Sequence, residues 1–469
     1  MELREIVSRT VAALPDTRAR RMKSKWAAPD PLRTSVVLAS LQLLFWTATA
    51  STWALYSELF LQRECSDRGL LGDACKSGAI GYDDAQSAAS TTLSWFALST
   101  GLASLATCSA VGVVGDARGR RVGLVLPGLG GLVYSLGFWL SPGSLTWPFL
   151  LPLAVLTGLC GGTFAAVHVC FASLADVTGE LSKTERTRRF GLVESWIWVG
   201  DLLGPTLGGL CVGRWGVQNG FSLSVVLYAA YLLVACCVYQ ETLAPERRAP
   251  FTWTKSNPIS ALRLLASKRT ARFYSAAVFF ALFAVSGGVT LIPFFTKKVL
   301  DFSAQKIGYA LSIYFAANAL GLFGLLPLML RRCTPKTVVV IATLCNSLVW
   351  VAWTTCRSEW QAWLYSACAV SAAMYFPVVR SLVASAFGPS QYGASLAALG
   401  TVQQITQMAS PTVFTQLWAA LDLNSAPMGT SFGIAAAIGA VGTAFALAAP
   451  PAQDEHDEAE VPLVPDDTA

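Results

Sequence analysis

Two acidic residues inside one apolar run constrain this chain more than any other feature of its sequence. The run extends from Gly191 to Gly209 and contains Glu194 and Asp201. These two residues are seven positions apart, so an α-helix places both on the same face. A charged side chain at the centre of a bilayer costs about 3 kcal/mol, and such residues face a bundle interior or a water-filled cavity. We therefore expect a membrane-spanning helix whose acidic face points into a bundle.

The composition of the chain is that of an integral membrane protein. Of its 469 residues, 54% are hydrophobic and only 13% are charged, which is about half the charged fraction of soluble domains. Twelve apolar segments approach the roughly 20 residues that a helix needs to cross a bilayer. The predicted spans are 34–61, 86–114, 122–140, 148–175, 189–212, 220–240, 272–296, 305–330, 337–356, 361–387, 392–418 and 429–450.

The distribution of Lys and Arg predicts the topology. If the N-terminus is inside, 25 of the 34 basic residues fall in cytoplasmic segments and 8 in outer connectors. This inward excess favours an even number of spans with both termini cytoplasmic. Because the basic residues border the spans, they are no sign of nucleic-acid binding.

The longest internal connector separates six spans from six, the pattern expected of repeat-built transporters. The predicted fold class is an all-α membrane protein with twelve transmembrane helices in two six-helix halves. The acidic C-terminal tail is expected to be disordered. For the basic N-terminal tail, disorder is favoured over a surface helix in the first fourteen residues. No signal peptide is visible, so the first span is expected to direct insertion. The predicted segments are the basic cytoplasmic tail 1–33, the N-terminal half 34–240, the cytoplasmic linker 241–271, the C-terminal half 272–450 and the acidic tail 451–469.

The twelve cysteines predict one candidate disulfide. Cys65 and Cys75 share the first predicted outer loop, where they pair if that face meets an oxidising compartment and otherwise remain free. Most other cysteines lie singly in spans and are expected to pack as small residues. The sequence has no metal-ligand spacing, no phosphate-binding glycine loop and no nucleophile–base motif. We therefore predict no metal, no cofactor and no enzymatic activity.

The connector between spans two and three carries a recognisable motif. Residues 112–121 read Gly-Val-Val-Gly-Asp-Ala-Arg-Gly-Arg-Arg, which resembles the signature loop of the major facilitator superfamily. Its glycines permit a tight turn, and its aspartate can face the positive end of a neighbouring helix. In the family this loop locks the two halves when the cytoplasmic gate is shut; a plain positive-inside loop is the alternative. The resemblance assigns the gate role to Gly115, Asp116, Arg120 and Arg121, with Asp176 at the end of span four as a partner.

The run that holds the two carboxylates is similar to the fifth-helix antiporter motif of the same superfamily. Glycines recur there at every fourth position and allow a neighbouring helix to pack closely. A Glu-Thr-Leu sequence at 241–243 resembles another marker of the superfamily. The motif residues are Gly200, Gly204, Pro205, Gly208 and Gly209.

Further matches are similar to the proton-coupled folate transporter family. They are Ala-Asp-Val-Thr at 175–178, Arg-Thr-Arg at 186–188 and Pro-Val-Val-Arg at 377–380. In that family an acidic residue early in the fifth helix serves proton coupling, and the arginine takes part in substrate and proton handling. Tetracycline-type drug/proton antiporters share the first of these matches and the glycine motif.

The sequence departs from the pattern of each of these two families at one place. A drug antiporter normally has an arginine where Ala154 stands, which weakens the antiporter interpretation. The folate group often has a histidine in the seventh helix, and residues 279–291 contain none, which weakens the assignment of folate as substrate.

Several polar residues inside predicted spans are candidates for function. A buried carboxylate or imidazole can exchange a proton as the side exposed to water changes. We expect Glu194 to carry the coupling proton, with Asp201 and His168 as further candidates and interhelical hydrogen bonding as the alternative for each. Arg380 is expected to meet a carboxylate of the other half or an anionic group of the substrate. The predicted cavity residues are Arg380, Gln403, Gln407, Asn318 and Tyr314.

These observations predict a secondary active transporter of a small organic solute. It works by alternating access around a site between the halves, driven by the proton gradient. A drug/proton antiporter is the alternative, and a non-transporting sensor on a transporter fold is a remote one. The predicted partners are a small-molecule substrate and the lipid bilayer, with no nucleic acid, and the protein is expected to be a monomer. Its expected location is the plasma membrane or a vacuolar or lysosomal membrane.

Overall fold

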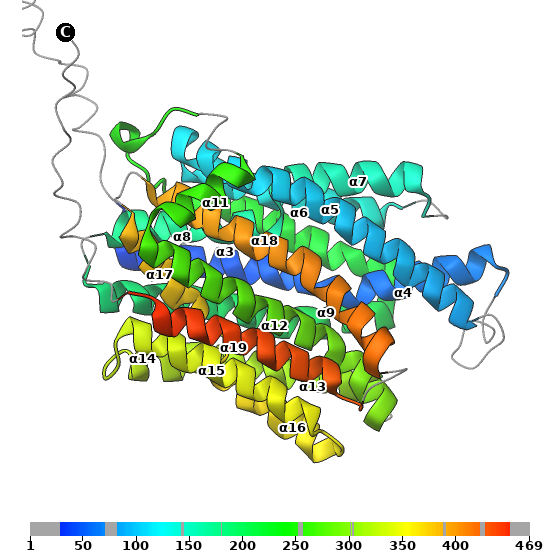
Figure 1. Cartoon of the computed structure of the whole chain (residues 1–469). Helices are drawn as coiled ribbons and strands as arrows, with labels where there is room; N and C mark the ends of the chain where they lie inside the picture. The colour runs from blue at the N-terminus through cyan, green and yellow to red at the C-terminus, as the bar shows by residue number, and fades with distance from the viewer. Residues whose placement is uncertain are drawn as a thin grey trace, which may run out of the picture.

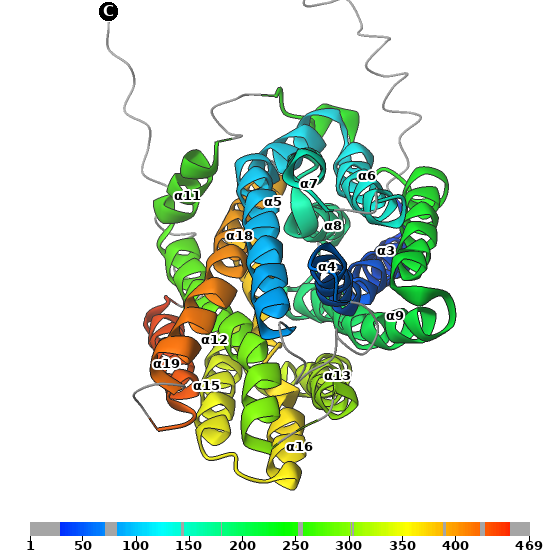
Figure 2. The same ribbon diagram turned by 90° about the vertical axis from the view of Figure 1, so that its right-hand side faces the viewer.

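The computed structural model describes residues 29–450 apart from 71–81, 142–144, 180, 252–256, 301, 303, 388–390 and 423–426. Both terminal tails predicted above therefore lie almost entirely outside the described residues. All regular elements of the described part are helices. They run nearly parallel along one long axis (Figure 1), and an end-on view separates the earlier helices from the later ones (Figure 2).

The N-terminal group begins with a helix that is interrupted at Thr52 and ends with a very long one. Short helices in the connector follow it. The elements are α3 (Pro31–Ser51), α4 (Trp53–Asp67), α5 (Tyr82–Arg118), α6 (Arg120–Trp139), α7 (Trp147–Leu159), α8 (Gly162–Thr178), α9 (Lys183–Leu233), η2 (Val234–Val238), η3 (Pro245–Arg247) and α11 (Pro258–Ser267).

The C-terminal group contains several helices that continue through short π or 3₁₀ turns. Its elements are α12 (Arg269–Leu300), α13 (Ala304–Leu320), η4 (Gly321–Leu325), α14 (Leu326–Met329), α15 (Pro335–Thr354), α16 (Glu359–Ala367), η5 (Cys368–Ser371), α17 (Tyr375–Ala386), α18 (Tyr392–Leu417), η7 (Trp418–Asp422) and α19 (Thr430–Ala448).

The described helices account for the twelve predicted spans. Ten helical segments are long and apolar enough to cross a membrane. One of them contains α9 and is long enough for two crossings, because it is bent at Gly216. The helix α18 is not among the ten; it is long and uncharged, but Thr, Ser and Gln residues lower its hydropathy. Counting α9 twice and adding α18 confirms the predicted twelve-helix, two-half fold.

The connection between the fifth and sixth spans differs from the prediction of a seven-residue connector. The chain stays helical from Lys183 to Leu233 except at Gly216, where φ is 79° and ψ is 168°. This positive φ favours glycine, because a side chain there would strain the backbone. A single residue therefore reverses the chain where the sequence predicted a loop.

The glycines of the fifth span pack the N-terminal half together. A Cβ atom added at Gly200 would lie 2.8 Å from Cβ of Trp46, and one added at Gly204 would lie 2.6 Å from Cβ of Ala50. One added at Gly208 would overlap the backbone carbonyl of Ser51. Gly200 and Gly204 thus meet α3 one turn apart, Gly208 meets its last residue, and the stripe lets α3 and α9 approach closely.

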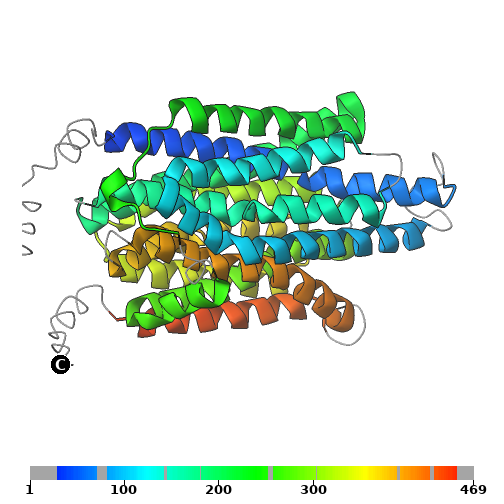
Figure 3. The same ribbon diagram turned by 90° about the horizontal axis from the view of Figure 1, so that it is seen from above.

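The end of the bundle opposite the 112–121 loop is built around aromatic side chains. Phe138 contacts Phe96 with ring centroids 5.5 Å apart and stacks on Phe221 at 5.3 Å. From there α4 and α5 project beyond the other helices (Figure 3). Cys65 near the end of α4 is disulfide-bonded, while its predicted partner Cys75 lies outside the described residues.

The close approach of α3 and α9 can be tested with a matched pair of substitutions. Gly204→Leu forces a side chain into α3, and such overpacking costs about 1–3 kcal/mol. We expect a lower thermal unfolding midpoint for the purified protein. The control is Gly209→Leu on the same helix, because an added Cβ there meets no atom within 4 Å. Equal midpoints for the two variants would contradict the packing role of the stripe.

Candidate functional site

A buried ion pair joins the two halves of the bundle. Nη1 of Arg380 in α17 donates to Oε2 of Glu194 in α9, and the two side chains are 2% and 4% exposed. An arginine in this environment stays charged, so it needs an anionic partner. Of the two partners predicted for Arg380, the structure brings it to a carboxylate of the other half.

Aromatic rings surround the guanidinium of Arg380. Its Cζ atom lies 4.6 Å from the ring centroid of Phe171 and 5.7 Å from that of Phe376. Cation–π contacts of this kind stabilise a desolvated cation without neutralising it. The Arg380 side chain is therefore held by one carboxylate and two ring faces.

Several polar atoms on α8, α9, α17 and α18 are buried and have no hydrogen-bond partner among the described residues. A buried donor or acceptor without a partner costs about 1–3 kcal/mol, so such a group marks a site that is completed by water or a ligand. The atoms are Nε of Arg380, Nε1 of Trp198, the hydroxyl of Tyr375, Oε1 of Gln403 and both ring nitrogens of His168.

On the side of the pair that lies toward the 112–121 loop, side chains of the two halves meet directly. Thr187 Oγ1 donates to Ser381 Oγ at 3.0 Å, and Nη2 of Arg186 donates to the Tyr392 hydroxyl at 3.1 Å. Cζ of Arg186 also lies 5.3 Å from the centroid of the Tyr392 ring. Thr187 precedes Glu194 by two helical turns, so these contacts close the site from one side.

On the opposite side of the pair the contacts between halves are aromatic. Trp198 follows Glu194 by one turn and lies 6.1 Å from Phe315 and 6.3 Å from Phe376, measured between ring centroids. Trp53 also contacts Phe315, at 6.2 Å. Contacts between the halves thus enclose the ion pair from both sides.

Trp198 was not among the predicted site residues. Its position four residues after Glu194 was a usable signal, because that spacing places both side chains on one helix face. The sequence does not reveal that Phe315 and Phe376 face it from the other half.

His168 lies at another contact between the halves. A Cβ atom added at Gly400 of α18 would overlap its imidazole ring, and the ring stacks on Phe164 with centroids 6.2 Å apart. The glycine is therefore needed for this close approach. His168 is therefore buried and faces α18.

Asp201 is separate from the ion pair. It is buried on α9, and its Oδ1 atom has no hydrogen-bond partner among the described residues. Seven helical residues correspond to a rise of about 10 Å from Glu194.

The other predicted cavity residues have different surroundings. Tyr314 and Asn318 are buried one turn apart on α13, and Nδ2 of Asn318 donates to the Tyr314 carbonyl at 2.8 Å. Gln403 is buried, whereas Gln407 is exposed and accepts a 2.7 Å hydrogen bond from Ser286 of α12. Gln407 therefore links two helices of the same half.

The motif at the end of α5 forms a compact charged network. Arg120 donates from Nη1 to Asp116, and from Nε and Nη2 to Asp176 at 2.8 and 3.2 Å. Thr242 donates to the same Asp176 carboxylate at 3.1 Å. The structure thus brings together the aspartates and the arginine that the sequence assigned to the gate, and all of them belong to the N-terminal half.

Glu241 completes this network and was missed as a site residue. Its carboxylate accepts the backbone N–H groups of Arg120 at 2.8 Å and Arg121 at 3.1 Å. An acidic side chain at the first N–H groups of a helix stabilises that helix end, here α6. Arg121 in turn donates from Nη2 to the Tyr239 carbonyl at 2.7 Å. The Glu-Thr-Leu marker was the available signal.

The network meets the C-terminal half at the start of α18. A Cβ atom added at Gly393 would overlap both Oδ1 of Asp116 and Nη1 of Arg120. The Asp116 carboxylate therefore lies against the positive end of a helix, where a negative charge is stabilised. No group of acidic, histidine and cysteine side chains in the described part of the chain is arranged to hold a metal ion.

Comparison with known proteins assigns the fold to a family. The tetracycline resistance protein, class C, of Escherichia coli is 25% identical over 312 residues, covering 66% of this chain and 76% of its own. A lysosomal proton-coupled steroid conjugate and bile acid symporter of Gallus gallus is 22% identical over 323 residues, covering 65% and 68%.

Solved structures agree with these relatives. The crystal structure of the human organic anion transporter MFSD10 aligns with a TM-score of 0.70 at 18% identity, covering 89% of this chain and 100% of that one; at this identity the likeness shows the fold. The family model of the Major Facilitator Superfamily matches residues 36–411. Because this match extends over most of the chain, the protein belongs to the Major Facilitator Superfamily.

Proposed function

We propose that this protein is a proton-coupled symporter of small organic anions. The observation that carries the proposal is the buried ion pair between Glu194 and Arg380, which connects the two halves. In this family the halves move relative to each other, so a charged contact between them is in a position to couple a proton to that motion.

The pair suggests a direct competition for Arg380. While Glu194 is ionised, it neutralises the guanidinium and leaves no charge for a substrate. When Glu194 takes up a proton, Arg380 loses its counter-ion in a low-dielectric site and needs another anion. A carboxylate or sulfonate of a substrate can satisfy it with paired hydrogen bonds. Proton and anion then cross together, and loss of the proton on the other side restores the pair and expels the anion.

The rings beside the pair favour a substrate with an apolar body. Phe171 and Phe376 present aromatic surface to the guanidinium, and Trp198 lies beside Phe376. The Trp198 indole N–H and the Tyr375 hydroxyl have no partner among the described residues. Two relatives are named as an organic anion transporter and as a symporter of steroid conjugates and bile acids. Both kinds of ligand combine an anionic group with apolar surface.

Drug/proton antiport is a second candidate function. It is favoured by the glycine motif of α9 and by the similarity to tetracycline resistance proteins. In this case a cationic drug would replace a proton on Glu194, so the proton would leave as the drug binds. The two functions therefore differ in the charge of the substrate and in the direction of the accompanying proton.

The proton role of Glu194 can be tested in proteoliposomes with a panel of organic anions and cationic drugs. In Glu194→Gln we expect gradient-driven accumulation to fall to the level of empty vesicles, because the side chain cannot change charge. Exchange of labelled for unlabelled substrate should persist. Glu185→Gln is the matched control, since Glu185 lies on the same helix and pairs with exposed Arg188. Undiminished proton-driven uptake by Glu194→Gln would refute the coupling, and a cationic substrate moving against protons would establish antiport.

The charged network of Asp116, Arg120 and Asp176, which we call the gate network, yields a separate prediction for the variant Asp176→Asn. Removing one member of a buried ion pair costs about 3–5 kcal/mol, and Arg120 lies against Gly393 of the other half. We expect faster hydrogen–deuterium exchange in peptides covering 181–190 and 391–400, where the halves touch. The control Glu246→Gln removes an exposed carboxylate from the same face and should leave exchange unchanged. Identical exchange in all three proteins would show that the network does not hold the halves together.

A further inference from the structure

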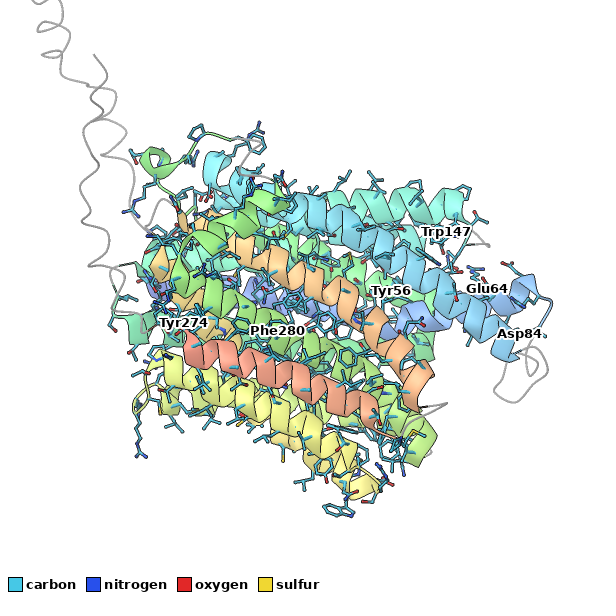
Figure 4. The ribbon with its side chains drawn as sticks, viewed as in Figure 1. Tyr56, Glu64, Asp84, Trp147, Tyr274 and Phe280 are labelled. Atoms are coloured by element: carbon cyan, nitrogen blue, oxygen red, sulfur yellow. The ribbon has the colours of Figure 1, made fainter. Side chains whose placement is uncertain are left out.

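A pocket that contains an arginine side chain lies in the N-terminal half, at the end opposite the Asp116–Arg120–Asp176 network. It measures about 350 Å³ and is lined by Leu59, Gln62 and Arg63 of α4 and by residues 215–219 around the bend of α9. Glu64, the residue after Arg63, lies at the end where α4 projects, on the same side of the bundle as Trp147 (Figure 4). The pocket is thus remote from the Glu194–Arg380 pair.

The guanidinium of Arg63 is held in place by a chain of hydrogen bonds. Its Nη2 atom donates to Oε1 of Gln218 at 3.0 Å. The Gln218 amide nitrogen in turn donates to the carbonyls of Trp139 at 3.0 Å and Ser141 at 3.1 Å. Both donors of that amide group are occupied, so its oxygen is fixed toward Arg63.

One donor of this oriented guanidinium is unused. Nε of Arg63 is buried and has no hydrogen-bond partner among the described residues. A charged donor in that condition gains most from an anionic acceptor, which forms shorter and stronger bonds than a neutral one. The planar fork of arginine matches phosphate oxygens in particular.

The pocket lies where the apolar surface of the bundle ends. Trp215 is 55% exposed, and tryptophans of this kind mark the headgroup level of a bilayer. Before it on the same helix, exposed leucines recur at helical spacing at positions 203, 207 and 210. An acyl chain can lie along such a surface while its headgroup reaches the pocket.

We propose that this pocket binds the phosphate group of an anionic membrane lipid, with Arg63 as its ligand and Gln218 as the residue that positions Arg63. The site is independent of the proposed transport mechanism, because none of its residues touches the ion pair. Inorganic phosphate offers the same oxygen atoms without an acyl chain, and the experiment separates the two sources.

The test uses the full chain in mixed micelles with a phosphatidylglycerol analogue that carries a photoactivatable group near its headgroup. Cross-linked peptides are mapped by mass spectrometry. We expect labelling of residues 59–63 and 215–219 that unlabelled phosphatidylglycerol suppresses and inorganic phosphate does not. Arg63→Gln should reduce labelling at this site by about tenfold, the effect of losing one charge-assisted hydrogen bond. Peptides at the opposite end of the bundle serve as the internal reference.

Two further variants keep the test decisive. Arg68→Gln removes the same charge from the same end of the chain, but Arg68 faces Glu64 at 3.8 Å with 43% of its side chain exposed, so labelling should persist. Asn219→Asp adds a carboxylate to an exposed wall of the pocket and should reduce labelling with Arg63 intact. Undiminished labelling in Arg63→Gln, equal labelling by a phosphatidylcholine analogue, or suppression by inorganic phosphate would each overturn the proposal.

Discussion

The ion pair between Glu194 and Arg380 is the interaction on which the arrangement of the two halves depends. Each charge alone would be costly to bury, and each finds its partner only when α9 and α17 lie side by side. Hydrogen bonds and a cation–π contact lie on the side of the pair toward the 112–121 loop, and aromatic rings lie on the other side. Neutralising either of these buried charges would therefore loosen the interface between the halves.

The helix α9 brings the packing and the charge of the protein together. Its glycines fix it against α3, so it belongs rigidly to the N-terminal half. The same helix presents Glu194 and Trp198 to the C-terminal half. Because one face of α9 is fixed against α3, the helix moves together with the N-terminal half. Such a movement would carry the Glu194 carboxylate with it. The charged network around Arg120 gives the loop 112–121 end of this half a similar rigidity, and it meets α18 at Gly393.

Much of this architecture could be predicted from the sequence, because it depends on local patterns. Apolar segment lengths predict the twelve spans, and the loop motif predicts that Asp116, Arg120 and Asp176 act together. The unpaired charge of Arg380 predicts a counter-ion. The identity of that counter-ion could not be predicted, because Glu194 and Arg380 are 186 residues apart in the sequence and meet only through the packing of the two halves. The same applies to the ring of Phe315 beside Trp198, and to the single-residue bend at Gly216 that replaces a loop.

The most direct test of the competition for Arg380 is the number of protons taken up when an organic anion binds. It can be measured by isothermal titration of the purified protein in buffers with different ionisation enthalpies. We predict proton uptake by the wild type, with affinity falling as pH rises, and binding without proton uptake by Glu194→Gln. Anion binding to the wild type without proton uptake would contradict the account, because it would leave the Glu194–Arg380 pair unbroken.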